Sequence, residues 1–227
     1  MAADSTRRDE PGDRSSADRS RARKRLVASG YDRMADAYLR SKGPLLPPVE
    51  ALLLALTAGL PPEAPVLDLG CGAGVPVTRW LAARCAVTGV DLSARQLALA
   101  RGHVPGATFI QSDMAAIDFP PDSFAAVVAT YAIIHLPREE QHALLARIAR
   151  WLRPGGCFLA TWPRDAWEGE EADWCGWGAP MWWSHHGRDT TLALLRAAGF
   201  AIDRAEEIAD GDETWLWVLA RAPGAGA

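Results

Sequence analysis

The chain has 227 residues, a formal net charge of −4, 49% apolar residues, four cysteines and ten tryptophans. This length and apolar content suit a single domain with a sizeable core. The mildly negative charge argues against a nucleic-acid partner, because phosphate binding requires a basic surface.

The cysteines and the distribution of apolar residues bear on the compartment. No C-x-x-C pair occurs, so we expect reduced core thiols and no metal site. The first two dozen residues lack the apolar segment of a secretory signal, and proline or charge interrupts each longer apolar run. We therefore expect a cytoplasmic protein without a membrane partner.

The N-terminal region divides into a polar segment and two helices. Residues 1–25 are mainly Arg, Asp and Ser, which bury too little surface to offset the entropy of ordering. We predict a disordered tail here and another over residues 222–227. Residues 26–39 have the apolar spacing of an amphipathic helix, and two prolines predict the start of a second helix over residues 49–58.

Residues 66–74 form the most informative stretch of the chain. A buried strand runs into Gly70, Gly72 and Gly74, where a Cβ would hinder close approach to a ligand, and helical spacing follows over residues 75–83. Strand, glycine turn and helix together make a cradle for a nucleotide-type ligand. Asp68 precedes the glycines, and its carboxylate would repel a pyrophosphate but attract an ammonium or sulfonium group. The pattern favours a cationic ligand.

The second strand, residues 86–91, ends in Asp91. A carboxylate at this position can accept hydrogen bonds from both hydroxyls of a ribose, so an unphosphorylated nucleoside fits. Ser93 with Gln96 predicts a capping box that opens a helix over residues 94–101, with Gly102 as its stop.

The rest of the chain alternates strands with helices. The pattern predicts strands over residues 107–111, 124–130 and 157–162, a helix over 137–152, a helix over 190–198 capped by Asp189, and two terminal strands over 201–208 and 214–220. This order predicts an α/β fold with a doubly wound, mostly parallel sheet that binds ligands at the carboxyl ends of its strands. Residues 164–186 fit neither period, and we expect a lid-like insertion at the same sheet edge.

Four motifs in this order resemble those of the class I S-adenosylmethionine-dependent methyltransferases. They lie at residues 66–74, 89–93, 112–114 and 153–156. The likeness extends over residues 26–221, and it is closest to small-molecule enzymes such as actinobacterial tailoring methyltransferases. It implies a Rossmann-like fold with a seven-stranded sheet, an antiparallel C-terminal edge hairpin and S-adenosylmethionine as cofactor, in a monomer or homodimer.

The resemblance also implies roles for individual residues. The three glycines would pass under the methionine part of the cofactor, Asp68 would help to hold its amino group, and Asp91 would bind the ribose. The adenine would lie against Leu92, Asp113 and Met114, with Tyr31 closing over the cofactor and Thr130 near the methyl group. Two alternatives stay open: Asp113 caps the loop after its strand, and Tyr31 and Tyr38 belong to the core face of their helix.

His135 follows the fourth strand, where the family presents catalytic groups. It is our candidate general base or substrate orienter, since imidazole titrates near neutrality, and the alternative is a hydrogen-bonded structural histidine. The family's Asn/Asp-Pro-Pro-Tyr/Phe turn is absent from residues 129–132, which disfavours methylation of nucleobases or amides.

The insertion concentrates aromatic residues near the expected opening. We assign substrate contacts to Tyr38, Tyr131, Trp182, Trp183 and His185, because aromatic faces suit a flat or cationic acceptor. The alternative is that the tryptophans fill a satellite core under a long loop. The expected function is methyl transfer to O, N, S or activated C of an aromatic small molecule; a non-catalytic cofactor-binding module and an NAD-dependent oxidoreductase are the alternatives.

Overall fold

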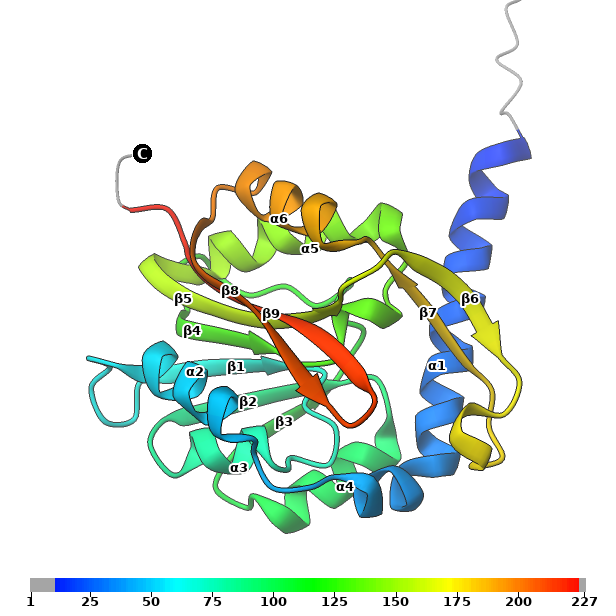
Figure 1. The fold of residues 1–227 in the computed structure, drawn as a ribbon, viewed down its shortest axis with the longest axis horizontal. Helices are drawn as coiled ribbons and strands as arrows, with labels where there is room; N and C mark the ends of the chain where they lie inside the picture. The colour runs from blue at the N-terminus through cyan, green and yellow to red at the C-terminus, as the bar shows by residue number, and fades with distance from the viewer. Residues whose placement is uncertain (1–10, 225–227) are drawn as a thin grey trace, which may run out of the picture.

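A computed structural model describes residues 11–224 of the chain. Its main sheet has seven strands in the order β3-β2-β1-β4-β5-β9-β8 (Figure 1). The strands are β1 Pro65–Leu69, β2 Ala86–Asp91, β3 Thr108–Gln111, β4 Phe124–Ala129, β5 Leu152–Pro163, β8 Ala201–Asp210 and β9 Glu213–Arg221. The first five run parallel, whereas β9 lies antiparallel between β5 and β8. The expected doubly wound sheet with an antiparallel edge hairpin is confirmed.

Helices cover both faces of this sheet. They are α2 Pro47–Thr57, α3 Val77–Ala82, α4 Ala94–His103, α5 Arg138–Trp151 and α6 Arg188–Ala197. Alternate residues of β1 face opposite cores: Val66 packs with α2 and α3, and Leu67 packs with α5 and α6. Because β4 lies between these two layers, all six of its residues are buried, which explains its continuous apolar sequence.

Helix α1, Pro11–Ser41, crosses the carboxyl ends of the parallel strands (Figure 1). The prediction of a disordered tail is wrong for residues 11–25, and residues 1–10 lie outside the described part. Polar contacts with distant elements hold this half of α1, including an ion pair of Arg23 with Glu168 at 3.1 Å. The predicted C-terminal tail also begins in contact with the fold, since the Ala222 amide donates to the Gly156 carbonyl at 2.9 Å.

The insertion after β5 is a β-ribbon that packs beside α1. Strands β6, Trp167–Glu171, and β7, Met181–His185, pair antiparallel, and a short 3-10 helix, η2 (Trp174–Gly176), lies in the turn. The sequence concealed these strands because every β7 residue is buried while β6 is exposed or half-buried, so neither strand alternates.

Two residues predicted to end or to cap a helix do not do so. Gly102 lies inside α4 rather than ending it, and Gly187, not Asp189, is the N-cap of α6. Ser93 does cap α4, accepting from the Gln96 amide at 3.1 Å. The Gln96 side chain has no hydrogen-bond partner among residues 16–224, so the capping box is only half formed.

The thiols of the four cysteines differ in burial. Cys71, Cys85 and Cys157 are buried free thiols, as expected, whereas the free thiol of Cys175 is exposed. Within residues 11–224, no helix has the length and apolarity needed to cross a bilayer.

Candidate functional site

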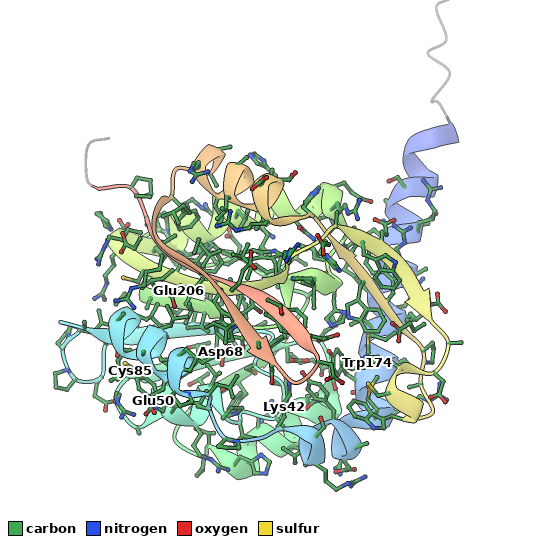
Figure 2. The ribbon with its side chains drawn as sticks, in the orientation of Figure 1. Lys42, Glu50, Asp68, Cys85, Trp174 and Glu206 are labelled. Carbon is green, nitrogen blue, oxygen red and sulfur yellow. The ribbon has the colours of Figure 1, made fainter. Side chains whose placement is uncertain are left out.

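A cavity of about 1010 Å³ opens at the carboxyl ends of the parallel strands. One half is formed by the loops after β1, β2 and β3, and the other by α1, the β6–β7 ribbon and the tip of the β8–β9 hairpin. Figure 2 labels Asp68, Lys42 and Trp174, which bring the sheet, the α1–α2 connection and the ribbon to this cavity.

The glycine turn after β1 follows the predicted conformation. Gly70, Gly72 and Gly74 have φ values of 73°, 53° and 76°, which side chains rarely adopt. A Cβ on Gly70 would lie 2.3 Å from the Cβ of Ala132, and one on Gly74 would lie 3.3 Å from that of Ala100. Close packing within the protein therefore requires two of the three glycines, in addition to any ligand.

Asp91 binds the same turn and faces the cavity. Its Oδ2 accepts from the Gly72 amide at 2.9 Å, and its Oδ1 accepts from the Ser93 amide at 2.8 Å. Burial raises the pKa of Asp91, although these amide hydrogen bonds oppose the shift. The carboxylate is thus fixed at the tip of β2, with lone pairs left for further donors.

Asp68 is only 1% exposed and has one unsatisfied oxygen. Its Oδ2 accepts from the Thr78 hydroxyl at 2.7 Å, whereas Oδ1 has no hydrogen-bond partner among the described residues. Burial raises the pKa of Asp68 to about 7 despite the Thr78 hydrogen bond. A cationic donor reaching Oδ1 would satisfy this oxygen and favour its ionised form.

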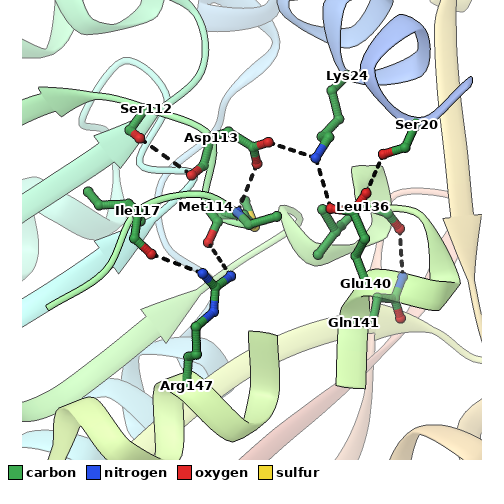
Figure 3. Close-up of polar contacts among 11 residues, drawn as sticks. Ser20, Lys24, Ser112, Asp113, Met114, Ile117, Leu136, Glu140, Gln141 and Arg147 are labelled. Carbon is green, nitrogen blue, oxygen red and sulfur yellow. Dashed lines mark hydrogen bonds and ion pairs between the residues drawn. The ribbon is translucent and has the colours of Figure 1, made fainter. Parts of the chain in front are cut away.

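Asp113 both caps its loop and lines the cavity. Its Oδ1 accepts from the Ala115 amide at 2.8 Å, which is the capping role left open above, and its Oδ2 lies 2.7 Å from Lys24 Nζ (Figure 3). Leu92 and Met114 also line this half of the cavity.

His135 lies at the end of a short 3-10 helix, η1 (Ile133–His135), and both of its ring nitrogens are bonded. Nδ1 lies 2.8 Å from the Trp182 carbonyl, which can only accept, so Nδ1 carries the proton. Nε2 therefore accepts from the Tyr31 hydroxyl at 2.9 Å. Burial lowers the pKa of His135 to about 4 and raises that of Tyr31, so the pair is neutral at pH 7.

Five rings form what we call the aromatic wall: Tyr31, Tyr38, Trp174, Trp177 and Trp183. Trp174 is at its centre, with ring centroids 5.8 Å from Tyr38, 5.2 Å from Trp177 and 5.3 Å from Trp183. All five line the cavity.

The other residues predicted to contact the substrate differ in whether and where they line the cavity. His185 lines the cavity, and its Nδ1 has no hydrogen-bond partner within the described part of the chain. The indole of Trp182 lies under the Arg23 guanidinium and does not line the cavity. Tyr131 lines the opposite side, where its hydroxyl donates to Asp210 at 2.9 Å. Thr130 precedes Tyr131 at the cavity surface.

Sequence reasoning missed two lysines of the cavity. Lys24 fell in the segment predicted to be a tail. Lys42 Nζ lies 4.1 Å and 5.0 Å from the ring centroids of Tyr38 and Tyr131, and no carboxylate of residues 16–224 pairs with it. Neither lysine belongs to a motif, so only the fold reveals their position.

The comparisons with known proteins agree with this geometry. A family model described as a methyltransferase domain matches residues 66–156. A sterol 24-C-methyltransferase of Gibberella zeae is 32% identical over 189 residues, 73% of this chain and 48% of its own length. A trans-aconitate 2-methyltransferase of Methylobacterium nodulans is 41% identical over 116 residues, 48% of this chain and 42% of its own. The chain thus spans about half the length of these curated relatives.

Solved structures extend the match to the fold. An S-adenosylmethionine-dependent methyltransferase from Mesorhizobium loti is 26% identical with a TM-score of 0.60, covering 76% of this chain and 96% of its own. Magnesium protoporphyrin IX methyltransferase from Synechocystis, solved with bound S-adenosylmethionine, is 17% identical with a TM-score of 0.65, covering 88% and 96%.

The residues present fit that cofactor. Asp68 Oδ1 is a buried acceptor to which no described residue donates, as an amino group requires, and the carboxylate of Asp91 retains acceptor capacity for hydroxyls at the tip of β2. The turn between them approaches Ala132 too closely for a side chain at Gly70. The chain carries a methyltransferase domain of the class I, Rossmann-like type, with S-adenosylmethionine as its cofactor.

Proposed function

We propose that the protein transfers the methyl group of S-adenosylmethionine to a small aromatic acceptor held against the aromatic wall. The observation that carries the proposal is the continuity of the cavity, which joins the glycine turn and Asp91 to Trp174 and Trp183 without a break. A donor site and a stacking surface in one cavity can bring two reactants together.

In this proposal, three carboxylates and one lysine each bind a different part of the cofactor. Asp91 accepts from the ribose hydroxyls, and Asp68 accepts from the amino group through its free oxygen. Asp113, beside Met114, accepts from the adenine amino group. Lys42, whose charge no carboxylate of residues 16–224 offsets, binds the carboxylate of the methionine part.

For this reaction the protein has mainly to align the methyl group of the donor with the acceptor atom. When bound, the cofactor supplies a methyl group already activated by the sulfonium. The aromatic wall excludes water and orients the acceptor. Where the acceptor atom carries a proton, Tyr31 Oη takes it while passing its own proton along the existing hydrogen bond to His135 Nε2, which is 2.9 Å away and carries no proton of its own.

The acceptor class follows from the wall. Its indole and phenol rings favour a flat ring system by stacking, with transfer to O, N, S or an activated carbon. Relatives include sterol and trans-aconitate methyltransferases, so a polycyclic lipid and a small carboxylic acid are the comparison substrates. We place the enzyme in cytoplasmic specialised metabolism, acting as a monomer or homodimer.

The test is a product screen by mass spectrometry. The purified protein is incubated with S-adenosylmethionine and separate sets of indoles, phenols and N-heterocycles, alongside sterols and trans-aconitate. We expect a methyl-group mass increase in an aromatic acceptor. Methylation confined to sterols would overturn the acceptor class, and tight binding of S-adenosylhomocysteine without any methylated product would favour a non-catalytic module.

Once an acceptor is known, Tyr31→Phe tests the proton route. For an acceptor that arrives protonated, we expect kcat to fall by about 100-fold or more because the variant cannot relay the proton. Affinity for S-adenosylhomocysteine should stay within about twofold. Turnover close to that of the parent would reduce the Tyr31–His135 pair to a packing contact.

A further inference from the structure

Lys24 of α1 lies between two carboxylates at one end of the cofactor half of the cavity. Its Nζ is 2.7 Å from Asp113 Oδ2 and 2.8 Å from Glu140 Oε2, and the three side chains are 16%, 23% and 27% exposed (Figure 3). The Ser20 hydroxyl donates to the other oxygen of Glu140. Partial burial lowers the pKa of Lys24, but the hydrogen bonds to both carboxylates outweigh this and raise it. One ammonium therefore joins α1 to the loop after β3 and to the first turn of α5.

The loop that carries Asp113 is held from the opposite side as well. Arg147 of α5 donates to the carbonyl oxygens of Met114 and Ile117, each at 3.2 Å (Figure 3). These bonds fix the backbone of the loop but not the outer oxygen of its carboxylate. Among the described residues, Lys24 is the group that fixes Asp113 Oδ2.

The other polar contacts of α1 reach the neighbouring loops of the same cavity. Asp32 accepts from the Ser93 hydroxyl at 2.5 Å, just after β2. Tyr31 bonds to His135, just after β4. Together with Lys24, these contacts join α1 to the loops after β2, β3 and β4. The contact with the loop after β3 is the ion pair that Lys24 shares between Asp113 and Glu140.

We propose that Lys24 is a positioning residue, which fixes the Asp113 carboxylate toward the adenine amino group and makes docking of the N-terminal half of α1 part of cofactor binding. The inference rests on the proposed cofactor site. Removing the ammonium would leave Asp113 and Glu140 as facing like charges, so Asp113 would turn away from its place. The docked half of α1 would lose its ion pair in the same step.

The first test compares dissociation constants for S-adenosylhomocysteine by isothermal titration calorimetry. We expect Lys24→Met to weaken binding by about tenfold or more and Lys24→Arg to recover most of the loss. Arg25→Met is the matched control, because Arg25 is the next residue of the same helix and is exposed. Should the Met variant fail to fold, Lys24→Gln keeps a donor and gives the same comparison at smaller amplitude. Affinity within twofold of the parent in the folded variant would overturn the proposal.

A second ligand separates positioning from a general structural role. S-inosylhomocysteine carries an oxygen where adenine carries its amino group, so a fixed Asp113 carboxylate discriminates against it. We expect the preference for S-adenosylhomocysteine to fall several-fold in Lys24→Met, and hydrogen exchange of residues 16–28 to lose its ligand-induced protection. Equal weakening of both ligands with an unchanged ratio would contradict positioning. A parent protein that binds neither ligand would instead refute the proposed function itself.

Discussion

At the scale of single residues, we expect the carboxyl group of Asp68 to make cofactor binding depend on pH. Burial raises the pKa of Asp68 to about 7, so the side chain is mostly neutral at pH 6 and mostly ionised at pH 8. Because an ammonium group binds the ionised form, affinity for S-adenosylhomocysteine should rise roughly tenfold over this interval. Binding near pH 7 should also release protons, which calorimetry in buffers of different ionisation enthalpy measures.

Asp68→Asn provides the control, since its amide cannot ionise. Its affinity should be lower and independent of pH between 6 and 8; a slope equal to that of the parent would show that another group titrates. The stability of the unliganded protein should respond in the opposite sense. The raised pKa contributes stability that is complete below about pH 4 and is lost as the pH rises through about 7, and Asp68→Asn should lack this term.

Asp91 allows a separate test of the ribose site. In the proposed site, Asp91→Ala removes two charge-assisted hydrogen bonds to the ribose, each worth roughly 1.5–3 kcal/mol at most, so we expect affinity to fall by about tenfold or more. The variant also frees the Gly72 and Ser93 amides that Asp91 now accepts from. Titration with S-adenosylhomocysteine measures the loss, and an unchanged dissociation constant would place the ribose elsewhere.

The sequence could place the residues of this half of the cavity because they follow directly from strand ends. Asp68 and Asp91 take their places from β1 and β2, and the glycines from the turn that joins β1 to α3. The acceptor half was less predictable, since it is assembled from segments remote in sequence. Trp182 and Trp183 are adjacent, yet only Trp183 reaches the cavity, because neighbours in a strand point to opposite faces.

At the scale of elements, the contact of α1 with β7 depends on a glycine. A Cβ on Gly30 would lie 2.7 Å from the Pro180 carbonyl oxygen, which is backbone and cannot move aside. Alanine favours a helix by about 0.5–1 kcal/mol, but overpacking costs about 1–3 kcal/mol. We expect Gly30→Ala to lower the free energy of unfolding by about 1 kcal/mol and to weaken S-adenosylhomocysteine binding, as α1 moves away from the cavity.

Gly102 is the matched control within another helix. It lies in α4, is exposed, and an added Cβ would meet nothing within 4 Å. Gly102→Ala should therefore stabilise the protein by about 0.5–1 kcal/mol and leave ligand binding unchanged. Urea denaturation compares the two variants, and a gain in stability for Gly30→Ala would contradict the packing described.

The order of elements was predictable, whereas two elements that cover the cavity were not. Apolar runs and glycine or proline boundaries predicted β1 to β5 and the helices between them, because these signals lie within each element's own sequence. The first half of α1 has almost no apolar residues, and contacts such as Arg23–Glu168, 145 residues apart, hold it in place. Local composition does not reveal ion pairs between residues far apart in the sequence, and it does not reveal the β6–β7 ribbon.

At the scale of the whole molecule, ligand binding should stabilise the fold cooperatively. The half of the cavity proposed to hold the cofactor is built from the loops after β1, β2 and β3, which come together only in the folded chain, so its ligand should bind the native state alone. S-adenosylhomocysteine at 100 times its dissociation constant contributes about 2.7 kcal/mol, and at about 2–4 °C per kcal/mol the melting temperature should rise by about 5–10 °C.

NAD serves as the control in the same thermal experiment. Asp68 and Asp91 disfavour a pyrophosphate at the glycine turn, so NAD at equal concentration should leave the melting temperature unchanged. Stabilisation by NAD with none by S-adenosylhomocysteine would support the oxidoreductase alternative.

The concentration of indoles around one opening makes the protein its own optical reporter. Six of the ten tryptophans border it: Trp167, Trp174, Trp177, Trp183, Trp215 and Trp217. A bound acceptor that absorbs near the indole emission band would quench the fluorescence of these tryptophans by energy transfer, because it would lie close to them. Unlabelled metabolites can therefore be screened for binding by the loss of tryptophan fluorescence, before any turnover has been detected.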